Sequence, residues 1–163
     1  MKTLVPYFIA IFSLVGTLKA KNDVCNDITY LTLDDHTRSR NYGVDGQYED
    51  VCDQTDCFLR PCFGTSIDWH GSNWYRVISP AGSKITDTYV EPHHCNTHHG
   101  GWINGTHPTV LDEIVDRTVC FSSTVFGDCN DWAIQEIQIR NCGEYYLYYL
   151  KETGFCDLRY CSE

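Results

Sequence analysis

The chain has 163 residues, with 22 acidic residues against 12 basic ones and a formal net charge of −10. A surface of that sign repels the phosphates of nucleic acids and the headgroups of anionic lipids, so neither is expected as a partner. The length suits a single domain, and the ten cysteines indicate that disulfide bonds help to stabilise it.

The first 20 residues have the three parts of a secretory signal peptide. Lys2 supplies the charged start, an apolar run extends from Leu4 to Val15, and small or compact residues precede Ala20. The run is too short to span a membrane, which needs about 20 apolar residues, and no later segment comes close. We therefore expect cleavage after Ala20, a secreted, extracellular product without a membrane span, and one mature domain over residues 21–163. An uncleaved anchor is the alternative.

Strand patterns dominate the mature chain. Residues 41–73 are rich in Gly, Asp and Ser and are expected to form loops. Aromatic and β-branched residues predict strands over 74–79, 134–140 and 145–150, whereas 112–119 could form a short helix or a strand. No long helical periodicity is present. The expected fold is therefore mainly β, a small disulfide-rich extracellular domain with long loops.

The number of cysteines points to a disulfide framework. An even count in a secreted chain predicts pairing, and each bond contributes about 2–4 kcal/mol to stability. No two cysteines are spaced as Cys-x-x-Cys, which disfavours a zinc ribbon. Their spacing alone does not choose among the many possible pairings. The cysteines are Cys25, Cys52, Cys57, Cys62, Cys95, Cys120, Cys129, Cys142, Cys156 and Cys161.

The common catalytic motifs are missing. The chain contains no HExxH zinc motif, no GxSxG nucleophile elbow, no phosphate-binding glycine loop and no EF-hand spacing. We therefore predict that the protein is not an enzyme and needs no cofactor. A catalytic triad assembled only by the fold has no sequence motif and is the alternative.

Histidines are concentrated between residues 92 and 108. Two adjacent pairs, His93 with His94 and His98 with His99, flank Cys95. Histidines at these spacings can bind Zn²⁺ or Cu²⁺, but histidines in a surface loop need no ligand. We predict no metal site, and these four residues are the candidates if one exists.

One N-glycosylation triplet occurs in the chain, at Asn104 to Thr106. Gly105 in its middle favours a turn, which makes the acceptor amide accessible. We therefore predict an N-glycan on Asn104.

An ordered series of short motifs extends through nearly the whole mature chain. It begins with Cys25, Tyr30, Leu31 and Cys52-Asp53, continues with Trp74-Tyr75-Arg76, Ala81-Gly82, Cys95-Asn96-Thr97, Trp102 and Asn104-Gly105-Thr106-His107-Pro108, and ends with Ile114-Val115, Arg117, Cys120, Cys142, Tyr145-Tyr146, Tyr148, Leu150 and Tyr160-Cys161. The series resembles the ten-cysteine domain of uromodulin and of the pancreatic zymogen-granule membrane glycoprotein. His107 belongs to that pattern, whereas the two histidine pairs do not.

The resemblance also implies a set of disulfides. The implied pairs are Cys25–Cys142, Cys52–Cys156, Cys95–Cys161 and Cys120–Cys129, which leaves Cys57–Cys62. The cysteines depart from the family in three ways. Tyr89 stands where the family has its third cysteine, Cys129 stands alone where the family has an adjacent pair, and Cys57 and Cys62 are additional.

The resemblance implies a small secreted glycoprotein that acts as a matrix, mucosal or microbe-decoy component. Its partners would be extracellular proteins, or microbial adhesins that recognise the glycan on Asn104. We expect the domain to stand alone, without the epidermal-growth-factor-like and zona pellucida modules of family members. The alternative is a module that itself binds a sugar, through Trp69, Trp74 or Trp102, or divalent cations, as in a mineral or skeletal matrix protein.

Overall fold

The computed structural model describes residues 25–57, 64–124, 129 and 134–163. The predicted signal peptide, residues 1–20, lies outside them. The described elements are nine strands and one short 3-10 helix: β1 (Leu31–Leu33), η1 (His36–Arg38), β2 (Val51–Cys52), β3 (Gly64–Thr65), β4 (Asn73–Val77), β5 (His99–Asn104), β6 (Ile114–Phe121), β7 (Ile134–Asn141), β8 (Tyr146–Leu150) and β9 (Leu158–Tyr160).

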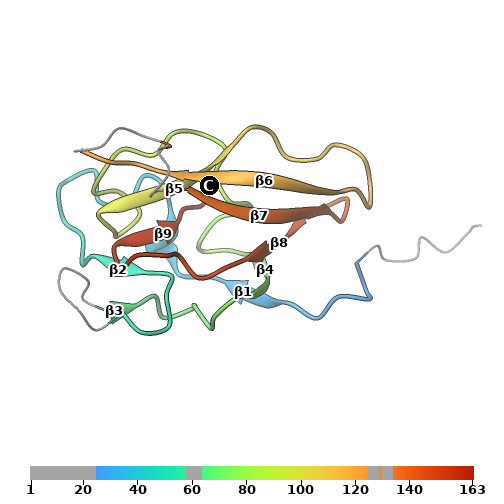
Figure 1. Cartoon of the computed structure of the whole chain (residues 1–163), viewed down its shortest axis with the longest axis horizontal. Helices are drawn as coiled ribbons and strands as arrows, with labels where there is room; N and C mark the ends of the chain where they lie inside the picture. Colours follow the sequence, from blue (N-terminus) through green and yellow to red (C-terminus); the bar gives the residue numbers. More distant parts are fainter. Residues whose placement is uncertain (1–24, 58–63, 125–128, 130–133) are drawn as a thin grey trace, which may run out of the picture.

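Seven of the strands form one curled sheet in the order β1-β4-β8-β7-β6-β5-β9. The five central strands run antiparallel to one another, and β1 and β9 add to the two edges in parallel. A bridge between Ser39, beyond β1, and Ser162, beyond β9, brings the two edges together. Figure 1 accordingly shows the strands around a common interior, with the small β2–β3 pair at one end.

The mainly β prediction is confirmed, and the ambiguous segment is resolved as a strand. Residues 114–121 form β6, because Ile114 to Cys120 pair in register with Arg140 to Ile134 of β7. The residues of a short amphipathic segment fit either a helix or a strand, and they do not show that the segment will lie between two other strands. The neighbouring chain therefore decides its conformation.

The main core fills the interior of the curl. Side chains that alternate along each strand point into it, as Ile137 and Ile139 do from β7 and Tyr148 and Leu150 from β8. Trp69, from the loop before β4, stacks on Tyr75 with ring centroids 5.1 Å apart. The other members are Leu33, Val77, Ala81, Ile85, Ile103, Val119, Phe121, Leu158 and Tyr160.

Two smaller clusters cover parts of the outer face of the sheet. Trp102 packs there with Val90 and the Cys95–Cys161 disulfide. Elsewhere on that face, the Cys25–Cys142 disulfide lies against Leu147, and Ile28, Tyr30, Trp74 and Tyr145 pack around them. Across β6, β7 and β8 the outer face is open and is lined mainly by polar side chains.

Candidate functional site

The predicted glycosylation triplet lies at the exposed end of strand β5. Asn104 is the last residue of β5 and is exposed, as are Gly105 and Thr106. Gly105 has a φ of +126°, a left-handed conformation that side chains disfavour, so glycine lets the chain turn away from the sheet here. Arg117 Nε donates a hydrogen bond of 2.9 Å to the Thr106 carbonyl, which holds the turn against β6.

His107 anchors the other side of this turn inside the protein. It is only 7% exposed. Its Nε2 lies 2.8 Å from the Tyr148 hydroxyl, and its Nδ1 lies 3.1 Å from Asp87 Oδ2. The next residue, Pro108, accepts a hydrogen bond of 2.9 Å from the Asn141 amide through its carbonyl oxygen. The asparagine that we predict to carry a glycan is therefore exposed on a turn whose two ends are fixed.

Burial lowers the pKa of His107 below its ordinary value of 6.5, although Asp87 partly opposes this effect. The unfolded chain thus binds more protons than the folded one just below pH 6.5. Stability from the neutral imidazole is present above that pH and is lost as the pH falls through it. We expect the free energy of unfolding to fall from pH 7.5 to pH 5.5, and His107→Gln to weaken that dependence.

Urea titrations at the two pH values measure this difference. His36→Gln, which removes an exposed imidazole from η1, is the matched control. Equal pH dependence in His107→Gln and the wild type would contradict the assignment.

Three of the four candidate metal ligands have side chains that contact other groups of the protein, whereas His94 makes backbone hydrogen bonds, to Glu91 and Thr97. His98 Nδ1 lies 2.7 Å from Asp50 Oδ2, and His98 Nε2 lies 3.2 Å from the Tyr48 hydroxyl. His99 Nδ1 lies 2.6 Å from the Ser122 carbonyl oxygen. The ring of His93 is centred 5.0 Å from that of His98.

These contacts do not bring the four histidines together as a ligand set. Within residues 25–57, 64–124, 129 and 134–163, three or more His, Cys, Asp or Glu ligand atoms lie within 4.8 Å of one another at one place, the sulfurs of Cys52, Cys57 and Cys156. None of the four histidines belongs to that group. His93 and His98 face each other only as neighbouring rings.

Three of the disulfides in the structure are pairs that the family resemblance implies. They join Cys25 to Cys142, Cys95 to Cys161 and Cys120 to Cys129. The first and second attach segments that are distant in sequence to the outer face of the sheet. The third joins Cys120 in β6 to a cysteine nine residues further along the chain.

The remaining pairs differ from the expectation. The structure joins Cys52 to Cys57, not Cys52 to Cys156, and so leaves no partner for a Cys57–Cys62 bond. Cys156 Sγ lies 3.3 Å from Cys57 Sγ and is unbonded within the described part of the chain, and Cys62 lies outside it. Because three sulfurs meet at one point, spacing along the chain could not show which two would bond.

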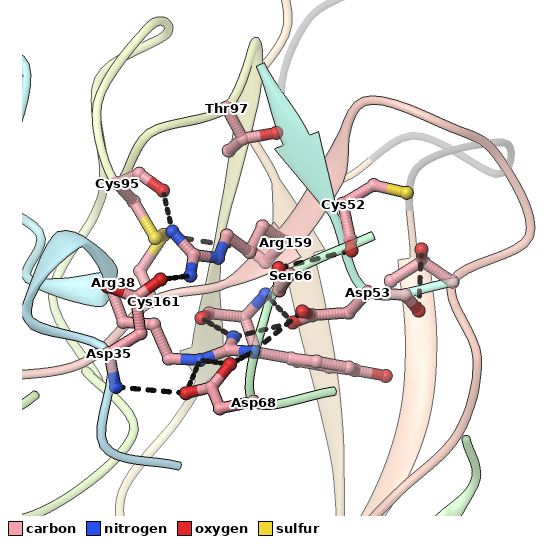
Figure 2. Close-up of polar contacts among 12 residues, drawn as sticks. Asp35, Arg38, Cys52, Asp53, Ser66, Asp68, Cys95, Thr97, Arg159 and Cys161 are labelled. Atoms are coloured by element: carbon pink, nitrogen blue, oxygen red, sulfur yellow. Dashed lines mark hydrogen bonds and ion pairs between the residues drawn. A yellow bond between two sulfur atoms is a disulfide. The ribbon is translucent and has the colours of Figure 1, made fainter. Parts of the chain in front are cut away.

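A buried network of charges is the part of the structure that sequence reasoning missed. Figure 2 shows the Arg38 guanidinium between two carboxylates, with Arg159 beside it. Arg38 Nη1 lies 2.7 Å from Asp53 Oδ2, and Arg38 Nη2 lies 2.5 Å from Asp68 Oδ1. Arg159 Nη2 lies 2.8 Å from Asp35 Oδ2. The partners are 15, 30 and 124 residues apart, so no local motif could reveal them.

The network joins the last strand to loops at the other edge of the sheet. Asp53 Oδ2 also accepts a hydrogen bond of 2.9 Å from the backbone N–H of Tyr160 in β9. Burial alone would raise the pKa of Asp68, but hydrogen bonds and charge from Arg38 outweigh it and lower that pKa to about 2. The stability that this carboxylate contributes is therefore present above pH 3.8 and is lost as the pH falls toward 2. Both oxygens of Asp53 and of Asp68 accept hydrogen bonds from the protein, so the network serves stability.

The three tryptophans considered for sugar binding have different environments. Trp69 is 4% exposed and Trp102 is 8% exposed, so neither ring has a face free for a ligand. Trp74 is half-buried and contacts Tyr149 on the outer face of the sheet, with ring centroids 5.6 Å apart.

Among the described residues, no helix has the length and apolar character to span a membrane.

The fold and its disulfides define a class, a small disulfide-rich β module of the kind found in extracellular glycoproteins. Residues 75–162 match a family model that is described as a uromodulin-like domain. The chain belongs to this family, as the resemblance indicated. The relatives in this family are non-enzymatic glycoproteins, which supports a non-enzymatic module at the level of the family.

Relatives in two kinds of glycoprotein match the chain. It is 34% identical over 142 residues to the pancreatic secretory granule membrane major glycoprotein GP2 of Canis lupus familiaris, covering 86% of this chain and 23% of the relative. The Homo sapiens GP2 is 38% identical over 96 residues, covering 58% and 17%. Uromodulin of Mus musculus is 34% identical over 142 residues, covering 86% and 18%. The chain therefore spans about a fifth of the length of these relatives.

Proposed function

We propose that this protein is a secreted, non-enzymatic glycoprotein module that acts by presenting an N-glycan on Asn104. Its partners would be extracellular proteins of a matrix or mucosal coat, or microbial adhesins for which the glycan serves as a decoy. The observation that carries the proposal is the exposed Asn104 at the end of β5.

The geometry of the turn supports presentation at a defined place. Arg117 fixes the Thr106 carbonyl on one side, and His107 is buried against Tyr148 on the other. A glycan attached to a fixed turn loses less freedom on binding than one on a mobile loop, so the entropic cost of binding a partner is smaller. The family match and the disulfide framework agree with a role outside the cell.

Changing the hydroxyl residue of the triplet tests the proposal. We expect Thr106→Ala to abolish glycosylation, because the triplet needs Ser or Thr at this position, and Thr106→Ser to retain it. The Thr106 contact to Arg117 uses the backbone carbonyl, so both variants keep it. Glycosidase treatment should lower the mass of the wild type and of Thr106→Ser by one N-glycan, with no shift in Thr106→Ala.

Binding of a mannose-specific microbial adhesin is the second measurement. Wild type and Thr106→Ser should bind, free mannoside should compete, and Thr106→Ala should not bind. A wild-type protein that runs at its peptide mass, or an adhesin that binds Thr106→Ala equally well, would overturn glycan presentation. Calorimetry with Ca²⁺ and Zn²⁺ tests the cation-binding alternative.

A further inference from the structure

An open hollow of about 470 Å³ lies on the outer face of the sheet, across β6, β7 and β8. Its volume falls in the range of small-ligand clefts, about 300–1,000 Å³. Strand pairing places Asp116, Gln138 and Tyr149 in one row across the three strands. Ile137, Glu136 and Lys151 complete the lining.

Only some of the polar groups that line the hollow form hydrogen bonds within the protein. Asp116 Oδ1 accepts a hydrogen bond of 3.2 Å from the Gln138 amide, and Glu136 Oε1 accepts one of 2.6 Å from Thr118 Oγ1. The Tyr149 hydroxyl and the Lys151 ammonium make no hydrogen bond to any described residue. A ligand in the hollow would thus meet both donors and acceptors that are available.

The mixture of charges favours a neutral ligand with many hydroxyl groups. Two carboxylates, from Asp116 and Glu136, oppose an anion such as a sulfated or sialylated sugar. The ammonium of Lys151 opposes a cation. The Tyr149 ring offers an apolar surface beside these polar groups, a combination that suits a sugar ring with C–H faces and hydroxyl edges.

The acceptor asparagine lies on this same face of the sheet. Asn104 pairs with Thr118 of β6, and Thr118 pairs with Glu136 of β7 at the rim of the hollow. Residues directly opposite one another in paired strands share a face, so the three side chains form one row. At about 4.8 Å per strand, Asn104 is roughly 10 Å from Glu136, a distance that the inner sugars of an N-glycan can span.

We propose that the inner, neutral sugars of the Asn104 glycan lie in this hollow, against Tyr149, Gln138 and Glu136. The inference rests on the proposed function, because it requires Asn104 to be glycosylated. The covalent link makes the contact intramolecular, with an effective concentration in the millimolar range, so weak sugar contacts suffice to hold the glycan in place. The outer sugars would then project from a defined direction.

The rate at which an endoglycosidase removes the glycan from the native protein tests the inference. A glycan held in the hollow is protected, so we expect Gln138→Ala and Glu136→Ala each to raise the rate about fivefold, the effect of one lost hydrogen bond. Glu144→Gln removes one charge from the exposed turn after β7 and should keep the wild-type rate. The same variants, once denatured, should all release the glycan at one common rate.

Nuclear Overhauser contacts between labelled sugars and the Tyr149 ring give an independent readout in the wild type. Intact mass spectrometry is done first and reports whether Asn104 carries a glycan. A glycan that is present but is released at equal rates from all variants, without contacts to Tyr149, would overturn this inference and leave glycan presentation intact. An unoccupied Asn104 would overturn the proposed function itself.

Discussion

Replacing Arg38 with methionine should destabilise the protein by about 3–5 kcal/mol, as expected when one partner of a buried ion pair is removed. Methionine keeps most of the length and removes the charge. The carboxylates of Asp53 and Asp68 would then be left buried without a cation, since the side chains of both are almost fully inaccessible. Arg38→Lys should also be costly, because an ammonium cannot form the paired hydrogen bonds of the guanidinium.

Denaturant titration with far-ultraviolet circular dichroism measures the loss. Arg40→Met is the matched control, since Arg40 is partly exposed and its pair with Glu163, at 3.2 Å, lies near the surface. Exposed pairs contribute about 0–1 kcal/mol, so the control should change stability little. A loss below about 1 kcal/mol in Arg38→Met, equal to that of the control, would contradict the structural role of the network.

Removing the Cys25–Cys142 disulfide should cost about 5 kcal/mol in the chain-entropy model. The bond joins residues 117 apart, and the entropy that a cross-link removes from the unfolded chain grows with the length of the loop. Breaking it also frees the segment that packs on Leu147 at the outer face of the sheet. The variant is the double replacement of both cysteines by alanine.

The Cys120–Cys129 disulfide provides the matched control. Its residues are 9 apart, and the same model gives about 2.5 kcal/mol for the corresponding double alanine variant. The difference between the two melting temperatures is the quantity to measure. If the short-loop variant loses as much stability as the long-loop variant, the constraint does not act through the unfolded chain as argued.

The strands could be predicted because their residues are suited to a pleated sheet. Residues 74–79, 134–140 and 145–150 were expected to be strands, and β4, β7 and β8 occupy these segments to within a few residues. Tyr148 and Leu150 alternate into the core, as the period of a strand requires. Residues 112–119 stayed ambiguous, because the two neighbouring strands that make them a strand come from other parts of the chain.

The sequence could predict the chemical motif of the candidate site but not the contacts that support it. The triplet at Asn104 predicts a glycan acceptor, since that motif is local, and its occupancy stays a prediction. The support for its turn was not predictable, because Arg117 and Tyr148 reach it from other strands. The hollow beside it depends on strand register, which places Asn104 and Glu136 on one face although they are distant along the chain.

By itself, the sequence determined the strand content and the family of this protein, and it predicts an N-glycan on Asn104. Each of these depends on the types of residue present and on their order over short distances. Only the tertiary structure decided which of Cys52, Cys57 and Cys156 are bonded, that Arg38 lies between Asp53 and Asp68, and where the open part of the sheet lies. The physical reason is that disulfides, buried ion pairs and strand register join atoms that are distant along the chain. Their partners are therefore chosen by the packing of the whole domain.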